Sequence, residues 1–264
     1  MTNNPYVFSP VEILSIRQET EIDWTFRVAF DAPVVGGQFL EVSLPGVGEA
    51  PISISDYGPG WLDLTIRRVG RVTDAVFKRA PGEALMVRGP YGNGFVPENF
   101  TGRKVVVVAG GTGLAPVRSL VRIFGLEGRH ASAFELLAGF KSPADMLYRE
   151  LFEQWQAAFP VHLTVDREAP GWPHLVGLIP SHLDRFDFSR EAETEWIVVG
   201  PPMMMKFTTL ALLEKGVPKE RITVSFERNM SCGIGKCGHC KIDETYVCLE
   251  GPVFPYTKAE QLLD

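Results

Sequence analysis

The stretch Lys104-Val-Val-Val-Val-Ala-Gly-Gly-Thr-Gly-Leu-Ala-Pro116 decides the fold expected for the second part of the chain. Its β-branched run contains no polar residue, which is typical of a parallel strand buried on both faces. Glycines follow at once, and Leu114, Val117 and Leu120 then mark one face of a helix. Strand, glycine turn and helix together predict the opening unit of a doubly wound α/β domain.

Strand and helix signals alternate from this unit to about residue 226. The further strands are expected over 134–138, 161–166, 196–200 and 222–226, and the helical segments over 143–159, 178–186 and 202–215. Five strands joined by helical crossovers predict a parallel sheet with helices on both faces. We expect this nucleotide domain to span residues 101–226.

The first hundred residues have a different pattern, with a period of two. Leu62, Leu64 and Ile66 alternate with polar residues, as expected for a half-buried strand. Six short strands separated by turn signals predict a small antiparallel β-barrel over residues 1–100. The strands are expected over 6–16, 22–30, 38–44, 51–55, 61–68 and 84–89, with one helical piece over 72–79.

All four cysteines lie in the last segment, residues 227–264. Cys232, Cys237, Cys240 and Cys248 have the spacing C-x4-C-x2-C-x7-C, the plant-type pattern for a [2Fe–2S] cluster. Glycines at 233, 235 and 238 allow positive φ angles and bring backbone N–H groups close to sulfur. Zinc is the strongest rival ligand, although zinc ribbons usually carry two C-x-x-C pairs and this chain has one. A disulfide framework is a weaker rival.

Composition excludes several classes of function. The net charge is −6, which argues against nucleic-acid binding because such proteins carry a basic face. No apolar run approaches the ~20 residues that span a bilayer. The start, Met1-Thr-Asn-Asn-Pro-Tyr6, has no basic region followed by an apolar core, so we expect no secretory signal and a cytoplasmic location.

Three segments have features of phosphate or cofactor binding, and each also has a purely structural interpretation. Gly110–Gly113 would let a pyrophosphate approach a helix N-terminus, or would simply form a tight strand–helix turn. Arg67–Thr73 runs from a strand into a helix that Thr73 can cap, with or without a bound phosphate. Pro51–Ser55 is compatible with an edge strand as well as with a flavin contact.

The order of barrel, nucleotide domain and cysteine loop resembles the ferredoxin–NADP⁺ reductase superfamily. Within it, the chain is similar over nearly its full length to one branch: electron-transfer subunits of dihydroorotate dehydrogenase, gamma subunits of soluble hydrogenases, and the beta subunit of anaerobic sulfite reductase. The matching segments are Pro51-Ile-Ser-Ile54, Gly70-Arg-Val-Thr73, Gly89-Pro-Tyr-Gly92, Gly110–Pro116, Gly200-Pro-Pro-Met203 and Glu227–Cys240.

The resemblance implies FAD on the barrel, NAD(P)H on the α/β domain and a [2Fe–2S] cluster on the four cysteines. The residues implied for FAD are Pro51, Ile52, Ser53, Ile66, Arg67, Gly70, Val72 and Thr73. Those implied for the nicotinamide nucleotide are Gly110, Gly111, Thr112, Gly113, Gly200, Pro201 and Met203. No protein side chain is expected to act as acid, base or nucleophile, because the cofactors supply the chemistry.

One departure from the superfamily pattern concerns the FAD phosphates. Arg and Tyr are usual where this chain has Ala50 and Ile52, so Arg67 and Arg68 are predicted to replace the missing arginine. The short hairpin before Cys248 is more similar to the sulfite reductase and hydrogenase subunits than to the dihydroorotate subunit.

The expected function is electron transfer from NAD(P)H through FAD and the cluster to a catalytic or ferredoxin-like iron–sulfur partner subunit. NADH is predicted to be favoured over NADPH, because Gly139-Phe-Lys-Ser142 offers one lysine and the third strand ends at Asp166. The alternatives are a dihydroorotate dehydrogenase subunit, a self-contained reductase and a non-enzymatic redox or metal sensor.

Overall fold

The computed structural model describes residues 4–189 and 193–262, and the chain forms two compact units. The first unit contains the chain up to Phe95 together with Phe226–Val253. The second contains Val96–Ser225 together with the chain from Phe254 onward. The chain therefore returns to the N-terminal unit after the nucleotide domain, and the cysteine segment belongs with the barrel strands.

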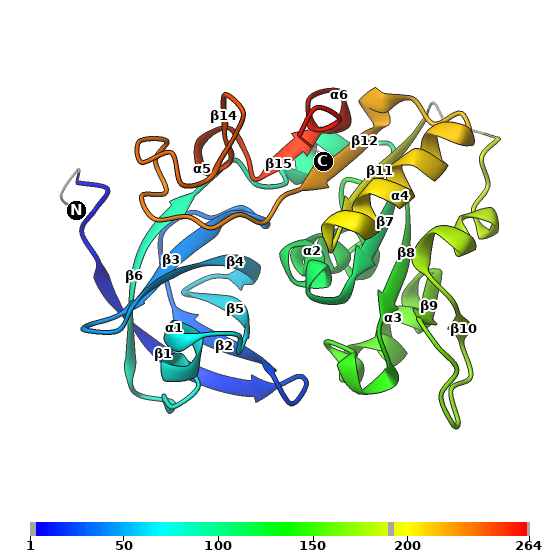
Figure 1. Cartoon of the computed structure of the whole chain (residues 1–264). Coiled ribbons are helices and arrows are strands. Elements are labelled where there is room, and N and C mark those ends of the chain that lie inside the picture. The colour runs from blue at the N-terminus through cyan, green and yellow to red at the C-terminus, as the bar shows by residue number, and fades with distance from the viewer. Residues whose placement is uncertain (1–3, 190–192, 263–264) are drawn as a thin grey trace. The chain divides into compact units, whose positions relative to one another are not determined.

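The first unit is built on the predicted six-stranded antiparallel barrel, which closes in the order β1-β2-β5-β4-β3-β6 (Figure 1). Its strands are β1 (Ser9–Gln18), β2 (Asp23–Ala29), β3 (Phe39–Leu44), β4 (Gly48–Gly58), β5 (Trp61–Arg67) and β6 (Ala84–Tyr91). The alternating residues Leu62, Leu64 and Ile66 all face the core and are at most 1% exposed. The period of two therefore placed the buried face correctly.

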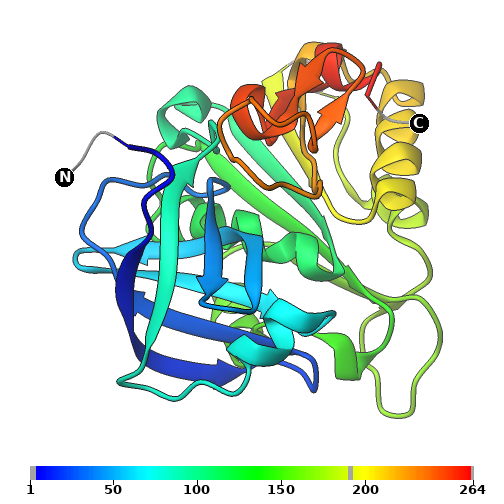
Figure 2. The same ribbon diagram turned by 60° about the vertical axis from the view of Figure 1, so that its left-hand side comes forward.

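The second unit is built on a seven-stranded sheet in the order β10-β9-β8-β7-β11-β12-β15. Its strands are β7 (Lys104–Gly110), β8 (Ala133–Phe140), β9 (Val161–Val165), β10 (Leu175–Val176), β11 (Thr194–Val199), β12 (Ile222–Ser225) and β15 (Val253–Pro255). The five predicted strands are central and parallel. The two short edge strands β10 and β15 were not predicted, because two or three residues give no periodic signal. Figure 2 shows the same strands from a second side.

The helices differ more from the prediction than the strands do. They are α1 (Arg71–Val76), α2 (Leu114–Leu120) with a π-helical continuation over Val121–Leu126, α3 (Phe152–Ala158), α4 (Pro202–Glu214), α5 (Val247–Glu250) and α6 (Tyr256–Ala259). Short 3-10 turns cover Pro97–Phe100, Gly111–Gly113, Pro143–Asp145, Arg149–Leu151, Ile179–Arg185 and Lys219–Arg221. A two-stranded hairpin, β13 (Lys241–Ile242) and β14 (Thr245–Tyr246), precedes the last cysteine.

The single helix predicted over 143–159 is wrong. The segment instead forms two 3-10 turns and then α3, with a break at Tyr148, whose φ of 57° is left-handed. Leu147 and Tyr148 are fully buried at the break. Burial of these two side chains thus overrides local helix propensity. The segment predicted as helical over 178–186 is a 3-10 helix rather than an α-helix, with Pro180 in its first turn.

Candidate redox centre and nucleotide-binding edge

The cysteine loop owes its shape to glycines. Gly233, Gly235 and Gly238 have φ angles of 74°, 69° and 80°, as the sequence predicted. A Cβ atom on Gly233 would lie 2.6 Å from the Tyr91 ring, so this glycine also lets the loop pack closely on β6. These positive φ angles turn the chain back on itself three times within a few residues.

Backbone amides surround the sulfur atoms of the loop. The N–H groups of Ile234, Lys236 and Cys237 donate to Cys232 Sγ at 3.4–3.5 Å. The other three sulfurs each accept one amide, from Gly235 to Cys248 at 3.2 Å, from Cys248 to Cys240 at 3.5 Å and from His239 to Cys237 at 3.5 Å. Such donors stabilise negative charge on thiolates. The loop is therefore prepared for anionic sulfur.

The thiols of Cys232 and Cys248 have opposite pKa shifts. Burial raises the pKa of Cys232, but the amides of the loop outweigh it and lower the pKa to about 6. Burial and a hydrogen bond with Cys240 raise the pKa of Cys248 to about 12. Four neighbouring thiolates are therefore not stable together on their own. A cationic centre would be needed to deprotonate all of them.

The grouping of the four thiols fits a binuclear cluster better than a single ion. Cys232 interacts with Cys237, and Cys240 with Cys248, so the sulfurs occur as two pairs. Among residues 4–189 and 193–262, no three His, Cys, Asp or Glu side chains converge on one metal position. Tetrahedral zinc requires four ligands around one point. A [2Fe–2S] cluster instead takes two protein ligands on each iron. All four cysteines are free thiols, which does not fit the disulfide alternative.

Arg88 on β6 fastens the loop to the barrel, and sequence reasoning missed it. Its guanidinium donates to the carbonyl oxygen of Cys232 at 2.7 Å and to that of Ser231. It also pairs with the Glu49 carboxylate at 2.9 Å, and the residue is only 5% exposed. The adjacent Gly89-Pro-Tyr-Gly92 motif was the only available signal. Arg88 and Cys232 are 144 residues apart, so no local pattern could pair them.

The predicted flavin residues on β4 divide between two faces. Ile52 packs against the barrel core, whereas its neighbours Pro51 and Ser53 alternate to the other face. Ile66 on β5 is 1% exposed in the core. The side chains of Ile52 and Ile66 therefore face away from any cofactor on the outside of the barrel, where only their backbone groups could bind one.

The predicted phosphate site at the start of α1 is organised differently from the expectation. Gly70, not Thr73, is at the N-cap, and Thr73 lies at the third helical position. Its hydroxyl accepts the N–H groups of Val69 and Gly70 at 3.0 and 3.1 Å. Thr73 thus caps the helix from within the first turn. Val72 is half-buried beside it.

Arg67 has an internal partner that the sequence did not reveal. Its guanidinium pairs with both carboxylate oxygens of Asp23, at 2.8 and 2.9 Å. The Asp23 side chain is 1% exposed, so this pair satisfies a buried charge. The Arg68 Nε atom lies 4.0 Å from Asp74. Both arginines predicted to replace the missing phosphate ligand therefore also carry an ion pair within the barrel's unit.

The two glycine motifs of the nucleotide domain meet at one edge of the sheet. β7 and β11 are parallel neighbours with Ala109 opposite Val199, so Gly110 and Gly200 follow at the same carboxyl end. A Cβ on Gly200 would lie 3.1 Å from the Gly110 nitrogen. Pro201 lies at the N-cap of α4, and Met203 is 58% exposed in its first turn. The structure thus places both predicted segments where open α/β sheets bind ligands.

The three residues of the turn do different things. Gly111 has a φ of 55° and open space where a Cβ would be, so its backbone can approach a ligand. Thr112 is half-buried beside it. A Cβ on Gly113 would lie 2.4 Å from the Val199 carbonyl oxygen. Gly113 is therefore required for packing between the turn and β11.

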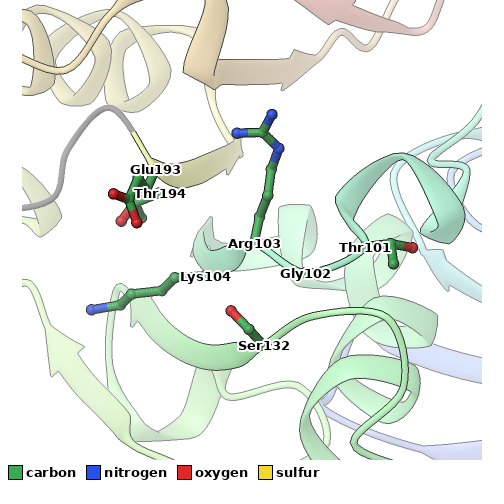
Figure 3. Close-up of a pocket in the computed structure, with 7 residues that line it drawn as sticks. All are labelled: Thr101, Gly102, Arg103, Lys104, Ser132, Glu193 and Thr194. Atoms are coloured by element: carbon green, nitrogen blue, oxygen red, sulfur yellow. The ribbon is translucent and has the colours of Figure 1, made fainter.

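A cavity of about 370 Å³ lies at the opposite, amino-terminal end of the sheet (Figure 3). Its lining residues are Thr101, Gly102, Arg103, Lys104, Ser132, Glu193 and Thr194. Arg103 lies 3.4 Å from Glu195, and Lys104 lies 2.6 Å from Glu135. Internal carboxylates thus neutralise its cations. It lies away from the glycine turns and is not the nucleotide site.

Comparison with known proteins supports these assignments. Residues 107–209 match the family described as an oxidoreductase NAD-binding domain. Residues 227–260 match the iron–sulfur cluster binding domain of dihydroorotate dehydrogenase B. The fold is shared with an NADH-dependent reduced ferredoxin–NADP oxidoreductase, at a TM-score of 0.79 and 24% identity, over 98% of this chain and 93% of that one. It is also shared with the ferredoxin reductase of carbazole 1,9a-dioxygenase, at a TM-score of 0.70 and 26% identity, over 83% and 68%.

Full-length relatives define the family. The gamma subunit of sulfhydrogenase 1 from Pyrococcus furiosus is 35% identical, over 96% of this chain and 92% of that protein. A probable dihydroorotate dehydrogenase B electron transfer subunit from Thermoplasma acidophilum is 32% identical, over 92% and 88%. The chain belongs to this family of oxidoreductase electron-transfer subunits, which serve multi-subunit enzymes. No helix in the described part of the chain is long and apolar enough to cross a bilayer.

Proposed function

We propose that this chain takes electrons from NADH and delivers them singly to the catalytic subunit of a soluble hydrogenase or an anaerobic sulfite reductase. The observation that carries the proposal is the paired arrangement of four thiols in the same unit as the barrel. Bound FAD and a [2Fe–2S] cluster would supply the conversion from two-electron to one-electron chemistry. The chain would act in the cytoplasm, where its thiols remain reduced.

The residues of the chain would bind and orient these groups. Pro51 and Ser53 on the outer face of β4, with the first turn of α1, would hold FAD. Gly111 and the start of α4 would receive the nicotinamide nucleotide, with Met203 beside the ring. Cys232, Cys237, Cys240 and Cys248 would hold the cluster. The corresponding division is residues 1–100 for FAD, 101–226 for NAD and 227–264 for the cluster.

Three other functions are separated by one purification. Anaerobic isolation with bound companions would identify a hydrogenase or sulfite reductase subunit, a dihydroorotate dehydrogenase, or no partner. The hydrogenase relative is favoured over the dihydroorotate one because its match covers more of both chains. A self-contained reductase would oxidise NADH with a small acceptor and bring no companion. A sensor would bind its centre without turnover.

FAD retention tests the role of Arg67. We expect Arg67→Ala to weaken FAD binding about tenfold or more, because charge-assisted hydrogen bonds to phosphate are lost. Released flavin, measured by fluorescence after gel filtration, reports the retention. Asp23→Asn is the matched control, since it breaks the same ion pair and leaves Arg67 charged. Equal losses in both variants would assign Arg67 to barrel structure, and retention unchanged in Arg67→Ala would remove it from the FAD site.

Nicotinamide choice tests the far end of the nucleotide edge. β8 and β9 are parallel neighbours, and the Asp166 N–H donates to the Phe140 carbonyl at 3.0 Å. Asp166 therefore lies beside Lys141, where a 2′-phosphate would meet a carboxylate. We expect a higher kcat/KM for NADH than for NADPH, by about tenfold. Steady-state rates with an artificial acceptor measure it, and Lys141→Ala should widen the difference. A preference for NADPH would overturn the assignment.

A further inference from the structure

Glu41 is a buried carboxyl group without a hydrogen-bond partner. It lies on β3, opposite Pro51 of β4 and Arg88 of β6. Its neighbours Leu40 and Val42 face the barrel core, so Glu41 faces the other side together with Pro51. The residue is 0% exposed, and neither carboxylate oxygen has a partner in the described part of the chain. Such a group requires an explanation, because buried charge is costly unless it is paired.

The surrounding charges do not satisfy Glu41. Arg88 is the nearest cation, but its guanidinium is bound by the Glu49 carboxylate and by the carbonyls of the cysteine loop. The titratable groups that act on Glu41 or are acted on by it are Arg88 and Tyr91 on β6, Glu49 on β4 and Cys232 in the loop. Burial raises the pKa of Glu41 to about 7, while Arg88 opposes the shift and Glu49 and Cys232 add to it.

We propose that Glu41 takes up one proton from solvent when the centre held by the cysteine loop gains one electron, and releases it when the electron leaves. This inference rests on the proposed function, which places an iron–sulfur centre on Cys232 and its companions. The electron comes from NADH or from an added reductant, and the proton neutralises the charge that the electron brings. The net charge of this buried region is therefore unchanged by reduction.

The coupling has a defined direction with pH. Added negative charge on the centre raises the pKa of Glu41 above its value in the oxidised protein. Below about pH 7 Glu41 is protonated in both states, so the reduction potential is independent of pH. Above about pH 7 reduction brings a proton with it, and the potential falls as pH rises. A tenfold change in proton concentration then corresponds to at most about 59 mV for a one-electron couple.

The test is a redox titration of the anaerobically purified full chain, followed by electron paramagnetic resonance, over about three pH units around neutrality. The parent should show a plateau at low pH and a slope above it. Glu41→Gln keeps the shape of the neutral side chain and should give a pH-independent potential. Glu12→Gln is the matched control, because Glu12 is exposed on β1, and it should keep the slope.

The outcomes separate this inference from the proposed function. A parent with no iron–sulfur signal would overturn both. A parent with a normal signal and a flat potential, or a slope that persists in Glu41→Gln, would overturn the role of Glu41 alone. If Glu41→Gln does not fold, infrared difference spectra of the parent decide the matter. Reduction above neutral pH should then produce a carboxylic-acid C=O band that shifts in D₂O, and its absence would contradict the proposal.

Discussion

Replacement of Cys237 by serine is expected to remove the iron–sulfur centre and leave FAD reducible by NADH. Cys237 is the exposed cysteine, whereas Cys232, Cys240 and Cys248 are buried, so its loss removes a ligand without opening the core. A hydroxyl is a much poorer ligand for iron than a thiolate. Three thiolates then remain for a centre that needs four. Iron content should fall from about two atoms per chain to nearly none.

Iron and sulfide analysis of anaerobically prepared protein measures this effect, and absorbance under NADH reports flavin reduction. Lys236→Ser is the matched control, because it introduces the same side chain at the adjacent position and keeps the backbone amide that donates to Cys232. Full iron content in Cys237→Ser would remove Cys237 from the ligand set. Zinc in place of iron in the parent would contradict the cluster assignment itself.

Gly113→Ala is expected to destabilise the nucleotide domain by about 3 kcal/mol or more. The added Cβ would lie 2.4 Å from the Val199 carbonyl oxygen and 2.7 Å from the Gly200 Cα. These are backbone atoms of β11 and of the turn that follows it, so no side-chain rotation relieves the overlap. The φ of Gly113 is −61°, which any residue adopts, so the effect is purely steric.

Thermal unfolding followed by circular dichroism measures the loss, with Gly111→Ala as its control. Gly111 has open space around its Cβ position but a φ of 55°, so alanine there should cost only about 1 kcal/mol. Gly111→Ala should instead weaken NADH binding, because this turn residue is the one open to a ligand. Equal melting temperatures for the two variants would show that the close contact at Gly113 is not required.

The sequence determined the architecture because its signals were local. Alternation in Trp61–Arg67 defined a half-buried barrel strand, and the unbroken run at Lys104–Ala109 defined a strand buried on both faces. The cysteine spacing likewise defined a four-thiolate site, because all four ligands lie within 17 consecutive residues. Each of these inferences needed only neighbouring residues and a known period.

Only the tertiary structure decided which of the candidate residues are engaged elsewhere. Asp23 neutralises Arg67 across 44 residues, and Arg88 reaches the loop across 144. The same long-range packing broke the predicted helix at Tyr148 and buried Glu41 without a hydrogen-bond partner among the described residues. The physical reason is that a side chain's charge state and orientation depend on which distant strands cover it. Periodicity determines which face a residue lies on, but not what packs against that face.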